Sequence, residues 1–372
     1  MKIGIDARLL SRPLTGIGRY TLEMCRALSK QPNTSLYLYS PAPIREEFLF
    51  GLETVNIRTK NWDHGLLRQL WSESFLPLWA KDDHVDVFWG PGHRLPRLLS
   101  KKIARVVTIH DLVWKYVPET MRPLSRLLER YQMPLAVYSS DAVVADSIAT
   151  AEAVKKEYGL ESDRLSVVPL SANLTERLNY SEILQQLAIV PSYFLFVGTL
   201  EPRKNLVRLL TAYSQLETHL KEQSNLVIAG GKGWGGVDVT QVITELGLIK
   251  FVRILGYVDD ATLAALYSNA QFLAMPSLYE GFGLPLLESM VHGTPVLTSN
   301  NSSMPEVAGD AGALVDALDI SSIKDGLELL ITNKEYRCEL ANNAKGNAAR
   351  YSWDKSAEKL LSVFEKAVLA RK

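Results

Sequence analysis

The sequence predicts an α/β protein built from two doubly wound parallel sheets, and three observations support this. The chain has 372 residues, more than twice the length of a typical domain. Short apolar, β-branched runs alternate with longer amphipathic segments, as in parallel strands connected by helices. One series of this alternation ends near residue 170, and a second begins at Tyr193. We therefore expect two Rossmann-like domains that face each other across a cleft, with a hinge near residues 171–190.

The first series defines an N-terminal domain at residues 1–175. Its expected strands are Lys2–Asp6, Leu36–Ser40, Val85–Trp89, Val106–Ile109, Ala142–Ala145 and Leu165–Val168. Its expected helices are Gly18–Lys30, Leu66–Ala80, Leu124–Tyr138 and Ala149–Tyr158.

The second series defines a C-terminal domain at residues 176–352. Its expected strands are Tyr193–Val197, Leu226–Ala229, Val252–Leu255, Gln271–Met275, Pro295–Thr298 and Ala313–Val315. Its expected helices are Leu206–Leu220, Val237–Leu246, Ala261–Ser268 and Leu284–His292. A last amphipathic helix is expected at Trp353–Ala370 with Ser352 as its N-cap, and residues 353–372 can pack back on the N-terminal domain.

The composition excludes several classes of protein. Lys plus Arg and Asp plus Glu each total 41, so a dedicated nucleic-acid binder is not favoured. The two cysteines, Cys25 and Cys338, lie far apart and indicate neither a disulfide framework nor a cysteine metal site. The first residues are not a signal peptide, and no apolar run approaches the ~20 residues that span a bilayer. We expect a cytoplasmic protein.

Two polar motifs follow strands of the first domain, where ligands of parallel sheets bind. Gly16 and Gly18 open a helix after the first strand, so backbone amides can approach an anion there. The alternative is a helix entry that only needs small residues. His110 and Asp111 follow the strand Val106–Ile109 and are placed to enter the cleft, although a satisfied structural histidine is the alternative.

The second domain opens with a strand, a glycine at Gly198, and two adjacent cations, Arg203 and Lys204, at the start of a helix. Cations are unfavourable at this end of a helix, because it already carries partial positive charge. A bound diphosphate is the simplest group to offset them, and partial neutralisation by Glu201 is the alternative.

The most specific motif is a glycine-bracketed turn that leads into a helix and contains two glutamates, Glu280 and Glu288. Helix amides here can donate to phosphate, and a carboxylate can accept from two vicinal hydroxyls. The turn also contains Ser277, Gly281, Phe282, Gly283 and Leu284. The alternative is that Glu288 merely suits a helix dipole. The glycine-rich run at residues 230–236 lacks a Walker arrangement and is interpreted as a mobile loop, and no Asp-x-Asp or metal-spaced cluster indicates a metal.

Taken together, these motifs resemble the retaining glycosyltransferases of family 4, which have the GT-B fold. The resemblance rests on the glycine loop at Gly16, His110 after its strand, the Arg203–Lys204 pair, and the two glutamates with seven residues between them, and it covers essentially the whole chain. It implies that the C-terminal domain binds a nucleotide-diphosphate sugar and the N-terminal domain binds the acceptor. It implies no metal and no other cofactor.

The resemblance also implies a role for each candidate residue. Arg203 and Lys204 would hold the diphosphate with the amides near Gly283 and Leu284, and Glu280 would face the donor sugar. Glu288 would bind the ribose, and His110 the outer sugar hydroxyls, with Asp111 on the acceptor side. The remaining donor-binding positions would be Gly16, Gly198, Tyr257, Ser277, Gly281 and Phe282.

The match of Glu280–Pro285 and of Ile109–Asp111 is similar to bacterial mannosyltransferases of O-antigen and exopolysaccharide pathways. This implies retaining transfer of mannose from GDP-mannose to a lipid-linked glycan. UDP-glucose, UDP-GlcNAc or another nucleotide sugar is an alternative donor. Two other classes remain open: a nucleotide-sugar epimerase, which needs no acceptor, and a non-enzymatic sugar-binding protein.

A membrane contact is a further hypothesis from the first half of the chain. Residues 1–180 carry 24 basic and 20 acidic side chains, and residues 94–102 mix cations with apolar residues. Arg122, Arg126 and Arg130 recur on a helix that also carries leucines. Such a face can associate with anionic lipid at the inner side of the cytoplasmic membrane, although a solvated charged face is an equal alternative.

Overall fold

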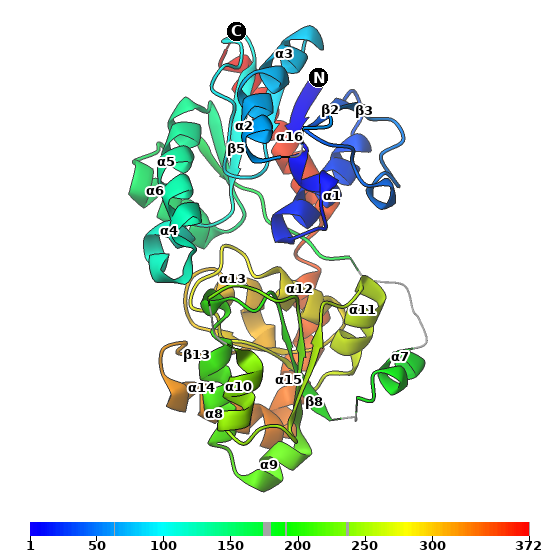
Figure 1. Cartoon of the computed structure of the whole chain (residues 1–372), viewed down its shortest axis with the longest axis vertical. Coiled ribbons are helices and arrows are strands. Elements are labelled where there is room, and N and C mark those ends of the chain that lie inside the picture. Colours follow the sequence, from blue (N-terminus) through cyan, green and yellow to red (C-terminus); the bar gives the residue numbers. More distant parts are fainter. Residues whose placement is uncertain (63, 174–179, 190–191, 236–237, 372) are drawn as a thin grey trace. The chain divides into compact units, whose positions relative to one another are not determined.

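The computed structural model describes the chain except residues 63, 174–179, 190–191, 236–237 and 372 (Figure 1). It divides into two compact units. The first contains residues 1–112, 127–170 and 351–372, and the second contains residues 113–126 and 171–350. The predicted hinge at 171–190 lies in part outside the described residues. The short segment 113–126 joins the second unit, whereas the sequence placed it in the N-terminal domain.

The first unit is built on a seven-stranded sheet in the order β3-β2-β1-β4-β5-β6-β7. Every neighbouring pair of strands is parallel. The strands are β1 (Lys2–Asp6), β2 (Ser35–Ser40), β3 (Asn56–Thr59), β4 (Val87–Gly90), β5 (Ala104–Ile109), β6 (Ala142–Ala145) and β7 (Leu165–Val167). The order reverses between β1 and β4, so the loops after these two strands open at one point of the sheet edge.

Helices cover the first sheet. They are α1 (Gly16–Ser29), α2 (Gly65–Glu73), α3 (Phe75–Asp82), most of α5 (Pro123–Ser139), α6 (Ile148–Tyr158) and α16 (Trp353–Leu369). Helix α16 packs on α1 and against β4, β5 and β6. Its Phe364 ring lies 6.0 Å from that of Trp89, and Ser356 donates to the Pro169 carbonyl at 2.6 Å. The end of the chain therefore completes the first unit.

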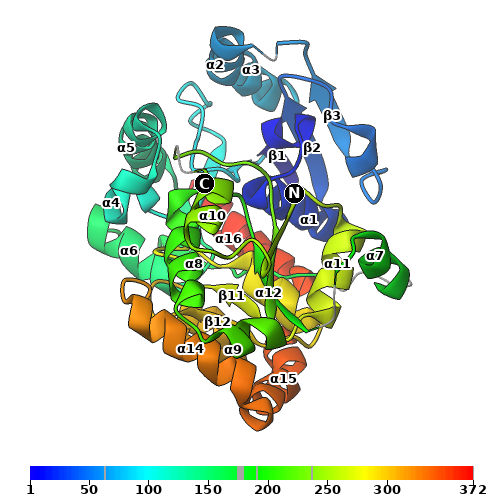
Figure 2. The same cartoon turned by 60° about the horizontal axis from the view of Figure 1, so that its bottom comes forward.

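The second unit has a six-stranded parallel sheet in the order β10-β9-β8-β11-β12-β13. The strands are β8 (Tyr193–Val197), β9 (Asn225–Ala229), β10 (Val252–Gly256), β11 (Leu273–Met275), β12 (Val296–Ser299) and β13 (Gly312–Val315). The helices are α4 (Val113–Tyr116), α7 (Tyr180–Gln186), α8 (Leu206–Ser214), α9 (Thr218–Gln223), α10 (Val239–Glu245), α11 (Asp260–Asn269), α12 (Leu284–Val291), α13 (Met304–Ala308), α14 (Ile320–Thr332) and α15 (Lys334–Ala348) (Figure 2).

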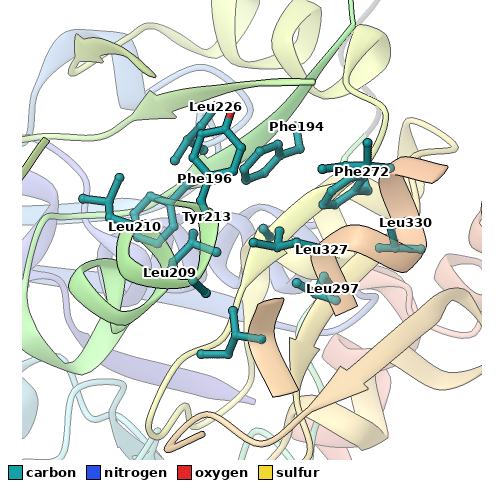
Figure 3. Packing of buried hydrophobic residues seen from close by; sticks show 14 of the residues in the cluster. Phe194, Phe196, Leu209, Leu210, Tyr213, Leu226, Phe272, Leu297, Leu327 and Leu330 are labelled. Carbon is teal, nitrogen blue, oxygen red and sulfur yellow. The ribbon is translucent and has the colours of Figure 1, made fainter. Parts of the chain in front are cut away.

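The alternation of side chains along β8 explains how the second sheet is covered on both faces. Phe194 and Phe196 point into the cluster with α8 and α14, where Phe194 stacks on Phe272 at 5.1 Å between ring centroids (Figure 3). Tyr193 points to the other face and donates to the Leu266 carbonyl of α11 at 2.7 Å. All five residues of β8 are buried, so this strand lies at the centre of the unit.

The predicted fold class, α/β with two doubly wound parallel sheets, is confirmed. Several element boundaries are corrected. The expected helix Leu66–Ala80 is two helices, α2 and α3, because Ser74 interrupts it. The expected helix Leu206–Leu220 likewise divides into α8 and α9. Strand β3 and helices α4, α7, α13, α14 and α15 were not predicted. The N-cap Ser352 of the last helix is confirmed, since its hydroxyl accepts from the Lys355 amide.

Candidate functional site

Two loops meet where the strand order of the second sheet reverses, between β8 and β11. The loop after β8 contains Arg203 and Lys204, and the loop after β11 contains Glu280. Backbone contacts join the two loops, since the Leu278 amide donates to the Arg203 carbonyl at 2.9 Å. The Asn205 side chain donates to the Pro276 carbonyl at 2.9 Å. Ligands of such sheets bind at this reversal point.

The three predicted catalytic side chains of this unit contact one another directly. Lys204 Nζ lies 2.7 Å from Glu280 Oε1, and Arg203 Nη1 lies 2.5 Å from Glu280 Oε2. Arg203 Nη2 also donates to Glu201 Oε1 at 2.7 Å. The sequence placed these residues in one site, and the structure brings them together.

The cluster is buried and strongly charged. Glu280 is 6% exposed and Lys204 is 8% exposed. Burial by itself raises the pKa of Glu280, but Arg203 and Lys204 outweigh it and hold that pKa at about 2. Ser277, in the same loop as Glu280, is fully buried. Glu280 is therefore an anion at neutral pH, which accepts hydrogen bonds and does not supply a proton.

The charge argument made from the sequence is corrected in one respect. Arg203 and Lys204 lie in a 3-10 turn, Pro202–Lys204, and helix α8 begins after Asn205. They do not face an uncompensated helix N-terminus, because Glu201 and Glu280 balance their two charges. The unfavourable charge at a helix start therefore does not by itself require a bound polyanion.

Gly283 forms the sharp entry into α12. Its φ of +92° lies in the left-handed region, and a Cβ there would lie 2.3 Å from Met304 Cε. The positive φ requires glycine, whereas the contact is with the end of a flexible methionine side chain, which can shift. Leu284 is the first residue of α12. Pro285 has no amide hydrogen and the Leu286 amide donates to the Gly283 carbonyl at 2.9 Å, so the Leu284 amide is the first-turn donor left without a partner inside the helix. The neighbouring Gly281 and Phe282 are buried.

Glu288 lies one turn further along α12 and is half-buried. Its Oε2 accepts a hydrogen bond of 2.9 Å from the Tyr267 hydroxyl of α11. This tyrosine, which the sequence did not single out, orients the carboxylate. The two predicted glutamates thus have different partners: Glu280 forms ion pairs with Arg203 and Lys204, and Glu288 accepts a hydrogen bond from the Tyr267 hydroxyl.

The other predicted donor-binding positions of this unit lie on loops that follow strands of the same sheet. Gly198 follows β8, and a Cβ there would lie 3.5 Å from Lys204 Cε. Tyr257 follows β10 and is 78% exposed. The loop after β9, at residues 230–235, reaches the cluster through Trp234, whose indole N–H donates to Glu201 Oε2 at 3.1 Å. Trp234 could not be predicted as a partner, because only the strand order brings the two loops together.

The first unit holds the remaining predicted residues. His110 follows β5 and is 6% exposed. Its Nδ1 contacts the Asp146 carboxylate, and its Nε2 lies 2.6 Å from the Pro91 carbonyl. Both partners accept hydrogen bonds, so both ring nitrogens are engaged inside the unit. The His110 amide also donates to His93 Nε2 at 2.9 Å. In this structure the His110 ring therefore has the hydrogen bonds expected of a structural histidine, which was the alternative interpretation.

Gly16 and Asp111 lie at loops of the same unit. Gly16 is the first residue of α1, is exposed, and has no atom within 4 Å of the position that a Cβ would take. The packing of the chain therefore does not require a glycine here. Asp111 directly follows His110 and is close enough to His93 to interact with it electrostatically. Within the described part of the chain, no three His, Cys, Asp or Glu side chains gather as a metal site.

Two protein-family models and several known proteins are similar to this chain. The family described as "Glycosyl transferases group 1" matches residues 181–347, and "Glycosyltransferase Family 4" matches residues 14–176. The O-antigen chain mannosyltransferase B of Escherichia coli is 30% identical over 98% of this chain and 100% of its own length. Among solved structures, the sucrose-phosphate synthase of Thermosynechococcus elongatus has a TM-score of 0.79 at 19% identity and covers 99% of both chains. WaaG, a glycosyltransferase involved in lipopolysaccharide biosynthesis, has a TM-score of 0.76 at 17% identity over 98% of this chain and 99% of its own.

Proposed function

The chain belongs to the family 4 glycosyltransferases, which have the GT-B fold, and on that premise we propose that it transfers mannose from GDP-mannose to a glycan acceptor in O-antigen synthesis. The full-length similarity to the E. coli O-antigen chain mannosyltransferase supports the sugar and the pathway. The contact of Arg203 and Lys204 with Glu280 at the reversal point of the second sheet carries the assignment of the site.

In this proposal the donor diphosphate binds at the cation cluster. Arg203 and Lys204 are already held by Glu201 and Glu280, so they are preorganised and need no reordering when the anion arrives. The phosphate oxygens then share the cations with the two carboxylates. Breaking the anomeric C–O bond places negative charge on the β-phosphate, and fixed donors at such a charge are typically worth ~3–4 kcal/mol each. The Leu284 amide at the start of α12 adds a further donor.

The low pKa of Glu280 decides its proposed role. A carboxyl with a pKa of about 2 is an anion throughout the working pH range, so it cannot act as a general acid. It can accept hydrogen bonds from hydroxyls of the donor sugar, and its charge can favour an oxocarbenium-like carbon. Glu288 would accept from the two ribose hydroxyls while Tyr267 fixes one of its oxygens.

The acceptor side of the proposal concerns the first unit. Gly16 would let the backbone approach the β-phosphate, and Asp111 would face the acceptor. His110 would contact the sugar only after giving up its bond to the Pro91 carbonyl, since both ring nitrogens are engaged. The acceptor hydroxyl attacks the anomeric carbon from the side on which the nucleoside diphosphate leaves, so the configuration is retained, and the departing phosphate accepts the proton of that hydroxyl. No metal is assigned a role.

The acceptor is proposed to be lipid-linked, so that the enzyme works at the inner face of the cytoplasmic membrane. In the described part of the chain, no helix is both long and apolar enough to cross a bilayer. A peripheral contact with anionic lipid would bring the protein to such an acceptor. The exposed leucines and arginines of α5 support this contact.

A donor screen tests the proposal. Thermal unfolding of the full chain would be measured with GDP, UDP and ADP and with their sugars, and then transfer to a mannose-terminated acceptor would be measured. We expect GDP-mannose to stabilise the protein most and to be turned over. Preference for UDP-glucose or UDP-GlcNAc would overturn the mannosyl assignment. Incubation of the sugar nucleotide alone should release nucleoside diphosphate slowly, whereas an epimerised sugar nucleotide would overturn the transferase assignment.

A further inference from the structure

The glycine-rich run after β9 holds none of the residues assigned to the proposed transfer, yet it is joined to the loop after β8. The Gly198 amide donates to the Ala229 carbonyl at 3.0 Å, and the Leu200 amide donates to the Gly231 carbonyl at 3.1 Å. These bonds extend the pairing of β8 with β9 past the ends of both strands. Residues 230–235 are therefore attached through their backbone to the loop that carries the two cations.

Two glycines of this run let the two backbones approach closely. A Cβ at Gly230 would lie 1.9 Å from the Gly198 carbonyl oxygen, and a Cβ at Gly233 would lie 1.9 Å from the Leu200 carbonyl oxygen. Backbone atoms cannot move aside as the end of a flexible side chain can, so this packing requires glycine at both positions. Gly231 differs, because no atom of the described residues lies within 4 Å of the position that its Cβ would take.

Trp234 follows the second of these glycines and connects the run to the cation cluster. Its indole N–H donates to Glu201 Oε2 at 3.1 Å, and Glu201 Oε1 accepts from Arg203 Nη2 at 2.7 Å. An indole nitrogen only donates and an ionised carboxylate only accepts, so the direction of both bonds is fixed. Each oxygen of Glu201 thus has a donor of its own. We call these two bonds the Trp234 relay.

The relay helps to fix the plane of the Arg203 guanidinium. Nη1 donates to the Tyr279 carbonyl at 2.9 Å and to Glu280 Oε2 at 2.5 Å. Bonds at this nitrogen alone would leave the plane free to turn about it, whereas the bond from Nη2 to Glu201 defines the plane. Arginine and glutamate side chains are long and have many rotamers. Trp234 therefore limits the rotamers of Glu201, and Glu201 limits those of Arg203.

The Trp234 ring has a second contact, which does not use its N–H. The guanidinium carbon of Arg122 lies over the ring, 5.9 Å from its centroid, and both residues belong to the second unit. Phenylalanine at position 234 would keep an aromatic ring for this cation and lose the hydrogen-bond donor. The two contacts can therefore be separated by one substitution.

From these contacts we propose that Trp234 is a positioning residue for the donor diphosphate, which acts through Glu201 on Arg203 and does not itself touch the donor. The glycines of the run hold the indole against the loop after β8. Arg203 then loses its rotamer freedom when the chain folds and not when the donor binds, so the diphosphate binds more tightly. The inference deepens the proposed function and rests on it, since Arg203 is the proposed diphosphate ligand.

Calorimetric binding of inorganic pyrophosphate to the full chain tests the relay without a sugar or an acceptor. Trp234→Phe should raise the Kd roughly three- to tenfold, which corresponds to ordering one long side chain on binding. With GDP-mannose the KM should rise by a similar factor while kcat stays within about twofold, because Arg203 is ordered once the donor is bound. The matched control is Trp79→Phe on helix α3 of the first unit, which should leave the Kd, KM and kcat unchanged.

A double-mutant cycle distinguishes positioning from general support of the fold. In the Glu201→Ala background, Trp234→Phe should change the Kd for pyrophosphate by less than about twofold, whatever Glu201→Ala does by itself, because the indole no longer has a carboxylate to hold. An equal effect of Trp234→Phe in both backgrounds would overturn the relay. An unchanged Kd of Trp234→Phe in the wild-type background would overturn it too.

Two glycine variants test the run that carries Trp234. Gly233→Ala should weaken pyrophosphate binding by about tenfold, because its Cβ displaces the Leu200 carbonyl and the loop that follows it. Gly231→Ala is the matched control, since its Cβ meets open space, and it should bind as the wild type does. Equal binding by the two variants would contradict the proposed packing. Thermal unfolding checks that both are folded, and if Gly233→Ala is not, the cycle with Glu201 decides.

The two readouts separate this inference from the proposed function. Pyrophosphate binding that depends on Trp234, without turnover of any nucleotide sugar, would overturn the transferase assignment only. Turnover of a nucleotide sugar with a Kd and a KM that do not depend on Trp234 would overturn the relay only. Absence of pyrophosphate binding to the wild type would also overturn the relay.

Discussion

Lys204 and Glu280 lie 76 residues apart in the chain and form a buried ion pair with 2.7 Å between Nζ and Oε1. Each stands on a loop after one of two adjacent parallel strands, β8 and β11. The two parallel strands therefore fix the geometry of the ion pair, and they hold its charged groups in place at the ligand-binding edge of the sheet. Arg203 completes it from the same turn as Lys204.

Replacing Lys204 by Ala should lower transfer by about 10²-fold or more, because a preorganised donor to the leaving phosphate is lost. Steady-state kinetics with GDP-mannose would measure it. The control is Lys232→Ala, an exposed lysine of the loop after β9, which should keep wild-type turnover. Near-normal turnover of a folded Lys204→Ala protein would remove this residue from the mechanism.

The Glu280 ion pairs should make stability depend on acid pH. The pKa of Glu280 is about 2 in the folded protein and ~4.3 in an unfolded chain. Its contribution, roughly a few kcal/mol, is therefore complete above pH ~4.3 and lost as the pH falls toward 2. Urea unfolding of the wild type and Glu280→Gln should show a difference that shrinks between pH 5 and 2, to the extent that the fold persists. A difference independent of pH would contradict the assignment.

Glu288→Ala should also lower transfer by about 10²-fold, because the proposed ribose contact is lost while the fold remains. The alternative, that this glutamate only interacts with the helix dipole, has a direct control. Glu288 is the fifth residue of α12, beyond its first turn, whereas Glu335 is exposed in the first turn of α15, where the dipole interaction is stronger, so Glu335→Ala gives an upper bound for the dipole effect. Equal small effects of the two variants would favour the dipole interpretation.

Gly16→Ala separates stability from function. No atom lies within 4 Å of the new Cβ and φ at this helix position is not positive, so the free energy of unfolding should rise by ~0.4–1 kcal/mol. Transfer should fall, since the methyl group would block close approach of a phosphate. Thermal unfolding and kinetics on the same preparation measure both. Full activity in the stabilised variant would rule out the proposed phosphate contact at Gly16.

Chelation tests the proposed independence from metals. Arg203, Lys204 and the Leu284 amide would together take the role that a divalent ion has at a leaving phosphate. Transfer measured with EDTA should therefore equal transfer measured with magnesium. Strict dependence on added magnesium would contradict this account.

The sequence predicts the strands well because buried parallel strands are short continuous apolar runs, such as Tyr193–Val197 and Lys2–Asp6, whose bounds agree with the structure. It misses β3 at Asn56–Thr59, which is an edge strand with mostly exposed side chains. Such a strand lacks the continuous apolar run of a buried strand, because it pairs with a neighbour on one side only and its side chains are mostly exposed to solvent. The divided helices show the opposite error, since amphipathic periodicity continues across Ser74 although the hydrogen-bond ladder does not.

The candidate site was predictable in its members and only partly in its arrangement. Arg203, Lys204 and Glu280 could be named from their loops, but their mutual pairing needs the order of the strands. The partners of His110 illustrate the same limit. Asp146 follows β6, the neighbour of β5, and Pro91 follows β4, its other neighbour. Nothing local in the sequence assigns them to one ring.

Helix α16 has a consequence for how the chain is made. A ribosome delivers residues 171–350, the bulk of the second unit, before it delivers the helix that places Phe364 beside Trp89. The first unit therefore begins to fold first but is completed last. Until α16 is synthesised, the apolar surface that α16 covers stays exposed and is prone to aggregation while the second unit folds. A fragment that ends at residue 350 would leave this apolar surface exposed permanently. Such a fragment is therefore a poor choice for expressing the first unit by itself.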